Sequence, residues 1–261
     1  MVAGVLKACK MNINFKNKLI LVTGSTYGIG FHIGKTLLNL GANVIFNSRS
    51  ANKKNLNVLD KNTYRHLIAD VSNKSQAENL LKKIKKECGL LDHIVCNVGN
   101  GSSVGIKFGS YQEIDMMLNR NLYTSSNIVS ISPDYMVKKD GSIVCISSIC
   151  GIENVGASPG YQLSKAALNM YVKSIAKFLN NYKIRINAVA PGNIMFEGSV
   201  WEKKVKTNKN EVLDMLKNQV ILNRFGTPEE ITNFVVFLLS SYSSFSTGKT
   251  FVVDGGQTKG I

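Results

Sequence analysis

The stretch "LVTGSTYGIG" at residues 21–30 decides the fold of this chain. It begins as an apolar run typical of a buried strand, and its glycines Gly24, Gly28 and Gly30 lead into a helical pattern. Glycine backbone can approach a phosphate closely, and the N–H groups that begin a helix attract an anion. The stretch therefore predicts a dinucleotide-binding turn. The alternative is a tight turn whose glycines serve packing alone.

The rest of the chain repeats this alternation of strand and helix. The strand candidates are "KLILVTG" (18–24), "ANVIFNS" (42–48), "YRHLIAD" (64–70), "DHIVCNV" (92–98), "GSIVCIS" (141–147), "IRINAVA" (184–190) and "TFVVDGG" (250–256). Strands separated by helices form parallel sheets, and their crossovers are right-handed. We therefore expect an α/β fold, a Rossmann-like doubly wound sheet of about seven parallel strands with helices on both faces. Ligands of such sheets gather beyond the carboxyl ends of the strands.

The chain length of 261 residues suits one domain, which we place at residues 11–261. Residues 1–10 look like an N-terminal appendage, with an apolar core too short for a secretory signal. Residues 193–223 break the alternation and contain an amphipathic segment around residues 212–216. We expect this section to be a substrate lid; a surface helical excursion is the alternative.

Composition narrows the classes of partner. The formal charge of +15 would attract an anion, but the lysines are dispersed, and the densest run, "LLKKIKKEC" at residues 80–88, has the spacing of a solvated helix face. We therefore expect no nucleic acid partner, and no apolar run is long enough to predict a membrane span. The five cysteines lack metal-type pairing, and most lie in strand-like stretches. Reduced thiols, no metal site and a cytoplasmic location are expected.

A second informative stretch is "SPGYQLSK" at residues 158–165. Ser158 is a good helix N-cap and Pro159 suits the first helical position. A helix that begins there places Tyr161 and Lys165 on one face. Taken alone, this spacing is also that of an ordinary surface pair.

The glycine spacing G-x-x-x-G-x-G, together with "YQLSK", resembles the short single-domain branch of the short-chain dehydrogenase/reductase family. The resemblance covers residues 18–257, and further matches follow in the family's order: "ADVS", "CNVG", "RNLYTS", "ISSICG" and "VAPGNI". In "CNVG", Cys96 and Val98 depart from the family pattern. The segments "LNRFGTPEEITNFVVFLLSS" and "VVDGGQ" look most like the 3-oxoacyl carrier-protein reductases.

The resemblance implies four catalytic residues: Asn121, Ser148, Tyr161 and Lys165. Tyr161 would give the proton to the substrate oxygen, and the ammonium of Lys165 is expected to lower the pKa of the phenol from about 10. Ser148 would hold the substrate oxygen; Ser147 is its rival, but neighbouring strand residues face opposite sides. Asn121 would hold a water that relays protons to Lys165.

The resemblance also implies a set of cofactor-binding residues. These are Gly24, Ser25, Tyr27, Gly28, Ile29, Gly30, Arg49, Asp70, Val71, Asn97, Gly99, Tyr161, Lys165, Pro191, Gly192 and Ile194. Within it, Asp70 would contact the adenine and the main chain of Ile194 the nicotinamide carboxamide. Two positions depart from the pattern. Phe196 stands where a threonine often anchors the carboxamide, and Tyr27 stands where some NADP enzymes carry a basic residue.

The end of the second strand, "ANVIFNSRS", bears on the choice of cofactor. It lacks the acidic residue that NAD-selective sites place there, whereas Arg49 could grip a 2′-phosphate or simply point into solvent. We expect NADP(H) to be preferred, with NAD(H) possible.

The resulting prediction is a ketone–alcohol oxidoreductase that acts on a small or carrier-linked carbonyl substrate. The alternatives are an NAD-dependent sugar or alcohol dehydrogenase and a non-catalytic dinucleotide-binding regulator. The resemblance further implies a homotetramer, paired through helices within residues 115–129 and 166–179.

Overall fold

The computed structural model describes residues 12–260 except 52–53, 61–62 and 102–106. The proposed N-terminal appendage, residues 1–10, lies outside the described residues. Among the described residues, seven parallel strands form one sheet in the order β3-β2-β1-β4-β5-β6-β7. The strands are β1 (Leu19–Val22), β2 (Asn43–Ser48), β3 (Tyr64–Ile68), β4 (His93–Cys96), β5 (Gly141–Ile146), β6 (Ile184–Pro191) and β7 (Thr250–Val253). The predicted fold class is confirmed, and all seven strand candidates contain a strand.

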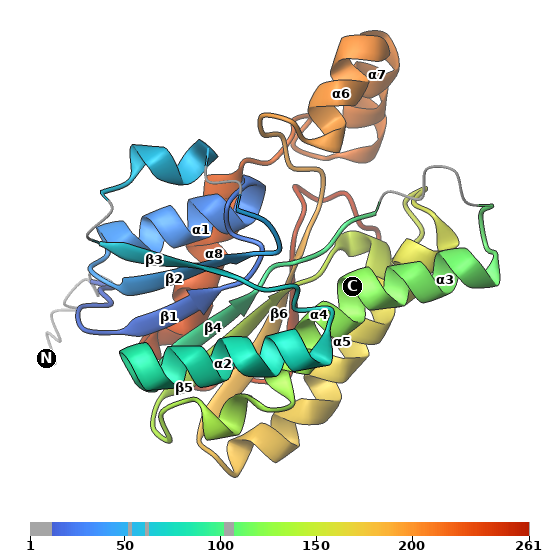
Figure 1. The fold of residues 1–261 in the computed structure, drawn as a ribbon. Coiled ribbons are helices and arrows are strands. Elements are labelled where there is room, and N and C mark those ends of the chain that lie inside the picture. The colour runs from blue at the N-terminus through green and yellow to red at the C-terminus, as the bar shows by residue number, and fades with distance from the viewer. Residues whose placement is uncertain (1–11, 52–53, 61–62, 102–106, 261) are drawn as a thin grey trace, which may run out of the picture.

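Helices cover both faces of this sheet (Figure 1). The α-helices are α1 (Gly28–Asn39), α2 (Lys74–Cys88), α3 (Tyr111–Leu118), α4 (Thr124–Val129), α5 (Pro159–Asn180), α6 (Val200–Thr207), α7 (Lys209–Gln219) and α8 (Pro228–Leu239). Short 3₁₀ turns lie at Lys54–Val58, Ser132–Asp134, Ile149–Gly151 and Ser241–Ser243. Helices α1 and α8 pack on one face of the sheet, and α2, α4 and α5 pack on the other. Helix α2 contains the lysine-rich run, as its helical spacing predicted.

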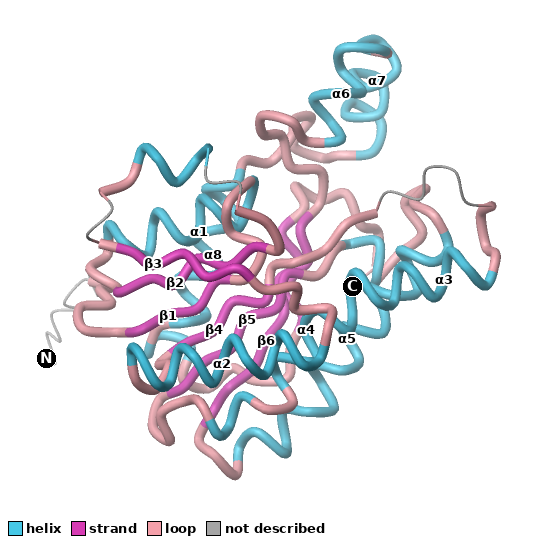
Figure 2. Tube along the Cα trace, in the orientation of Figure 1, coloured by secondary structure: helices cyan, strands magenta, loops and turns pink. Residues whose placement is uncertain are grey.

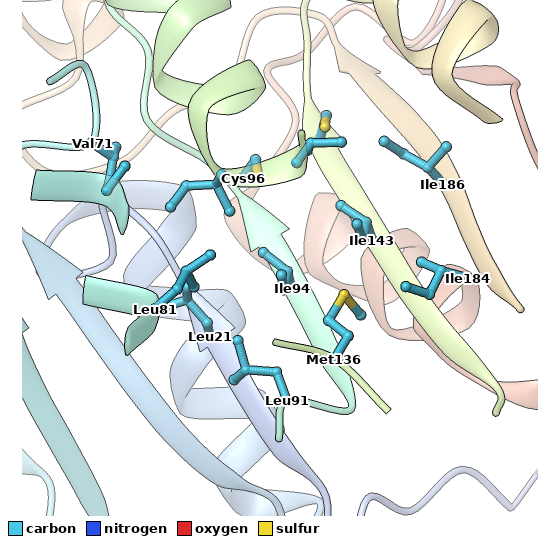
Figure 3. Close-up of a cluster of buried hydrophobic side chains, with 14 of the residues drawn as sticks. Leu21, Val71, Leu81, Leu91, Ile94, Cys96, Met136, Ile143, Ile184 and Ile186 are labelled. Atoms are coloured by element: carbon cyan, nitrogen blue, oxygen red, sulfur yellow. The ribbon is translucent and has the colours of Figure 1, made fainter. Parts of the chain in front are cut away.

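Two hydrophobic cores, one on each face, hold the helices against the sheet. Successive strand residues alternate between them: Leu21 and Ile94 point into the core under α2 and α5, whereas Ile20 and Val95 point into the core under α1 and α8. Figure 3 shows the first of these cores. Each fully buried side chain of this size stabilises the fold by about 1.5–3 kcal/mol, so the central strands are fixed from both sides.

The strand order places the site. The chain runs from β1 outward through β2 to β3 and then crosses back to β4, which pairs with the other edge of β1. At such a reversal the two connections leave the sheet in opposite directions and open a crevice at the carboxyl ends of the strands. The glycine-rich turn after β1 and the "CNVG" segment at the end of β4 therefore lie side by side at this end of the sheet.

Residues 193–223 contain α6 and α7, and the predicted amphipathic segment lies within α7. The two helices project from the sheet as a pair (Figures 1 and 2). They have a small core of their own, in which Val212, Leu216 and Val220 pack against Trp201 and Phe225. Their function as a lid stays a prediction.

The four described cysteines carry free thiols. Cys96 and Cys145 are buried in neighbouring strands. Cys88 instead ends α2, and Cys150 lies in the 3₁₀ turn after β5, so two of the four described cysteines lie in strands, while Cys9 lies outside the described residues. The apolar runs that contain these two residues pack as helix face and turn.

No helix in the described part of the chain combines the length and the apolarity needed to cross a bilayer.

Candidate active site

The helix α5 begins where the sequence predicts it. Ser158 caps it by accepting a hydrogen bond from the N–H of Tyr161, and Pro159 is its first residue. Tyr161 and Lys165 lie on one face, with Lys165 Nζ 5.9 Å from the centre of the Tyr161 ring. Lys165 is buried, and its ammonium donates a 2.9 Å hydrogen bond to the main-chain oxygen of Ile146 at the end of β5. The pair is therefore an interior feature and no ordinary surface pair.

The two serines after β5 have different surroundings. The hydroxyl of Ser148 lowers the pKa of Tyr161 and accepts a 3.2 Å bond from the N–H of Cys150. The hydroxyl of Ser147 donates to Asn169 Oδ1 at 2.6 Å. Ser148 is thus the serine beside the phenol, while Ser147 ties the strand end to α5.

Burial controls the acid–base properties of this pair. The pKa of Tyr161 is raised to about 12, mainly by burial and also by the Cys150 thiol, against the lowering effect of Ser148. Burial also lowers the pKa of Lys165 to about 8, against the opposing effects of the Cys145 and Cys150 thiols. The expectation that Lys165 brings the phenol's pKa below its usual value was wrong for the chain by itself, because loss of solvation penalises the phenolate more than the neighbouring groups stabilise it.

Asn121 lies in a π-helical turn, Asn119–Tyr123, that links α3 to α4. It is fully buried, its Oδ1 accepts from the N–H of Asn100 at 2.9 Å, and its Nδ2 donates to the oxygens of Asn100 and Met117. A Cβ on Gly99 would lie 2.9 Å from Asn121 Oδ1 and 3.0 Å from Lys165 Nζ. Glycine at this position lets the main chain pass between the two side chains. Sequence reasoning missed the π turn, which "MMLNRNLY" does not signal.

The glycine-rich turn forms a cradle at the amino end of α1. Gly24 and Gly28 have φ angles of +59° and +56°, and the turn is held to β4 by Asn97, whose Nδ2 donates to the oxygen of Gly24 at 2.9 Å. Ile29 and Gly30 lie in the first turn of α1, where main-chain N–H groups face outward from the helix end. This cradle fits the pyrophosphate of a dinucleotide.

The hydroxyl of Ser25, a residue predicted to bind the cofactor, makes hydrogen bonds within the protein. This buried hydroxyl donates to the oxygen of Val22 at 2.6 Å and accepts from the N–H of Asn47 at 3.0 Å. It therefore braces the turn against β2.

The predicted adenosine-binding residues lie at the carboxyl ends of β2 and β3. Arg49 is exposed directly after β2. The carboxylate of Asp70 accepts from the N–H and the hydroxyl of Ser72, and the side chain of Val71 is buried in a core. Asp70 and Val71 could therefore offer main-chain groups and one carboxylate edge to a ligand.

Pro191 ends β6, and Gly192 and Ile194 follow it. Gly192 donates its N–H to the oxygen of Val253 at 3.0 Å, and a parallel bridge pairs Ile194 with Gly226. The ring of Phe196 packs edge-on against Tyr27 at 5.5 Å. The sequence identified both residues as departures from the family pattern but did not show that they touch.

A cavity of about 940 Å³ lies at the C-terminal end of the chain. It lies between the loop 153–156, the end of α7 and the C-terminal residues 256–259. Its lining includes neither Ser148 nor Tyr161, so it is not the reaction centre itself.

Comparison with known proteins agrees with this arrangement. The sequence model of the enoyl-(acyl carrier protein) reductase family matches residues 24–258. The 3-oxoacyl-[acyl-carrier-protein] reductase of Thermotoga maritima is 32% identical over 251 residues, which cover 94% of this chain and 99% of that protein. The human dehydrogenase/reductase SDR family member 2, described as mitochondrial, is 30% identical over 248 residues, covering 93% of this chain and 87% of that protein.

Solved structures give the same answer. The crystal structure of L-sorbose reductase from Gluconobacter frateurii, complexed with NADPH and L-sorbose, matches with a TM-score of 0.87 and 25% sequence identity, covering 96% of this chain and all of that one. The sequence match and the shared fold both extend over nearly the whole chain. The chain therefore belongs to the short-chain dehydrogenase/reductase family, as an NAD(P)-dependent oxidoreductase whose sequence is similar to those of the 3-oxoacyl carrier-protein reductases.

Proposed function

We propose that this protein reduces a ketone to a secondary alcohol with NADPH and that Tyr161 supplies the proton. The observation that carries the proposal is the placement of three groups at the carboxyl end of β5. Ser148 acts on the pKa of the Tyr161 phenol, and the ammonium of Lys165 lies 5.9 Å from the centre of the Tyr161 ring. A protein that only binds a dinucleotide has no need of such a proton donor.

The dinucleotide, held on the glycine-rich cradle, would supply the hydride. Tyr161 is a protonated acid at neutral pH, because its pKa is about 12, and it gives its proton to the substrate oxygen as negative charge develops there. Ser148 donates a hydrogen bond to the same oxygen. The ammonium of Lys165 compensates the charge that Tyr161 acquires. Lys165 would then pass a proton to the Tyr161 phenolate, and a water held by Asn121 would return a proton to Lys165; the proximity of Asn121 and Lys165, which flank Gly99, supports this relay.

The preference for NADPH is proposed from the end of β2. Asn47 is occupied within the sheet, since its Nδ2 donates to the oxygens of Leu67 and Ala69. Arg49 is exposed immediately after it and offers a planar guanidinium to a 2′-phosphate. The L-sorbose reductase with a similar fold binds NADPH.

The substrate class is proposed as a small or carrier-linked ketone. A sugar or alcohol dehydrogenase activity is the second candidate, favoured by the polar lining of the 940 Å³ cavity, which includes Asn154, Asn218 and Gln219. We also propose that α6 and α7 form a lid over the substrate site. We further propose that the protein is cytoplasmic. Its proposed assembly is a homotetramer in which the exposed apolar side chains of α5 are buried.

The test is Tyr161→Phe, which removes the acidic proton and keeps the ring. Loss of general acid catalysis should lower NADPH-dependent turnover of a ketone panel by about 10²–10⁴-fold. NADPH binding, followed by fluorescence, should be nearly unchanged. Tyr171→Phe is the matched control, since Tyr171 lies on the same helix and its buried hydroxyl has no hydrogen-bond partner among the described residues. A Tyr161→Phe protein that keeps most of the wild-type rate would refute the proposal.

A further inference from the structure

Tyr27 of the glycine-rich turn and Phe196 of the segment after β6 are far apart in the sequence but in direct contact. Their ring centres are 5.5 Å apart and the ring planes meet at 72°, the edge-to-face arrangement that aromatic pairs prefer. Tyr27 remains 46% exposed, so the pair lies at the surface of the crevice. The contact joins the cradle for the pyrophosphate to the base of the α6–α7 pair.

A second contact reinforces the first. The Tyr27 hydroxyl donates a hydrogen bond to the main-chain oxygen of Glu197. Gly198, the next residue, has a φ of +74°, and a Cβ there would collide with the Tyr27 hydroxyl. The main chain at residues 197–198 thus accommodates the tyrosine closely.

The ring of Phe196 also covers Gly28. A Cβ on Gly28 would lie 2.9 Å from Phe196 Cε2, so the ring occupies the space directly outside the first residue of α1. This helix end carries the N–H groups that would hold an anion. A ligand that approaches these N–H groups from the side of Phe196 must move the ring.

We propose that Tyr27 and Phe196 act together as an aromatic clasp between the glycine-rich turn and residues 193–199, and that this clasp must open for the dinucleotide to bind and to leave. This inference rests on the proposed function, since it concerns the cofactor of the same site. A cavity of about 360 Å³ lies beside the clasp, lined by Thr26, Phe31, His32 and Asn55 together with the clasp residues. It gives the rings room to swing aside.

A gate has a kinetic signature that a direct ligand contact lacks. If opening of the clasp limits both the binding and the release of the dinucleotide, weakening the clasp raises the association and dissociation rates together. The equilibrium affinity then stays nearly unchanged. If Phe196 instead touches the bound ligand, its loss raises the dissociation rate alone. The two rates therefore separate a gate from a contact.

The experiment is stopped-flow fluorescence of NADPH binding to the full chain. Tyr27→Phe removes the hydrogen bond to Glu197 and keeps the ring; Phe196→Leu removes the aromatic edge and keeps an apolar side chain. Each variant should raise both rates by about fivefold, the effect of one hydrogen bond or aromatic pair, and the double variant should add little because the two residues act as a unit. Trp201→Leu is the control, because Trp201 packs on Phe225 within the α6–α7 core, and its rates should match wild type.

A readout without cofactor accompanies the kinetics. Hydrogen exchange of the main-chain N–H groups at residues 193–199 should quicken in Tyr27→Phe and stay unchanged in Trp201→Leu. Rates within twofold of wild type in both clasp variants, a rise in dissociation alone, or unchanged exchange would each overturn the clasp while the wild-type protein still binds NADPH. A wild-type protein that binds no NADPH would overturn the proposed function and the clasp with it.

Discussion

At the residue scale, the site is governed by the protonation of two groups on one helix face, the partly buried Tyr161 and the buried Lys165. Tyr161 holds its proton with a pKa of about 12, whereas Lys165 loses one with a pKa of about 8. The phenol is therefore always ready to donate near neutral pH. The ammonium is the group whose state changes within the range of ordinary assays.

This difference predicts the pH dependence of reduction. Because burial lowers the pKa of Lys165 to about 8, its ammonium is present below that pH and is lost above it. We expect kcat/KM for NADPH, measured at saturating ketone, to fall above about pH 8, since this ratio reports the free enzyme. Steady-state rates measured across a pH series would show this fall in kcat/KM. A profile that stays flat to about pH 10 would contradict it.

Arg49 gives the second prediction at this scale. Arg49→Ala removes the guanidinium at the end of β2 and should weaken NADPH binding by about 1.5–3 kcal/mol, the range for a hydrogen bond to a charged group. NADH lacks the 2′-phosphate, so its binding should hardly change and serves as the internal control. Titration of both cofactors against both proteins measures the effect. Equal losses for NADH and NADPH would show that Arg49 reads no phosphate.

At the element scale, α5 has two working faces. One carries Tyr161 and Lys165 into the site. The other presents Leu163, Met170 and Phe178, whose side chains are 51%, 60% and 45% exposed, at spacings that align them along the helix. An apolar stripe of this kind on a surface helix marks an interaction site.

We predict that this stripe joins protomers. Burying a side chain such as Met170 contributes about 1.5–3 kcal/mol, and twofold symmetry would count it twice. Met170→Glu should therefore shift the wild-type oligomer towards monomer at micromolar concentration, as light scattering would record. Lys86→Glu on α2 makes a charge change away from the stripe and should leave the assembly intact. A wild-type protein that is monomeric at micromolar concentration would contradict this prediction.

The elements also show what sequence could and could not predict. Strand runs and the cap at Ser158 depend on a few neighbouring residues, so their pattern was readable. The raised pKa of Tyr161 was not, because it depends on burial by segments distant in the chain. The contact between Tyr27 and Phe196 was hidden for the same reason. Each residue looked like an isolated departure from a family pattern until the fold brought the two together.

At the scale of the whole molecule, the end of the sheet opposite the site carries a different kind of titrating group. His93 begins β4, is 5% exposed and packs edge-on against Phe15. Burial lowers its pKa to about 4, reinforced by Lys18 and Arg185 and opposed by Asp92 and Asp140. The folded protein therefore keeps this ring neutral.

Stability should follow this difference. In the unfolded chain His93 takes up a proton near its ordinary pKa of 6.5, whereas the folded chain takes it up only near 4, so the contribution is complete above 6.5 and is lost as the pH falls between these values. We expect the free energy of unfolding to drop by about 2 kcal/mol from pH 7 to pH 5 on account of this group. Urea unfolding at both pH values measures it. His93→Gln should flatten the dependence of the free energy of unfolding on pH. If the variant loses as much stability between pH 7 and pH 5 as the wild type does, the dependence belongs to other groups.

The separate core of α6 and α7 has an evolutionary consequence. Val212, Leu216 and Val220 belong to neither of the two cores that hold the sheet. Substitutions there can accumulate, or the whole hairpin can be exchanged for that of a homologue, while the catalytic framework keeps its stability. Lineages could thus diversify this one module and inherit the remaining machinery unaltered.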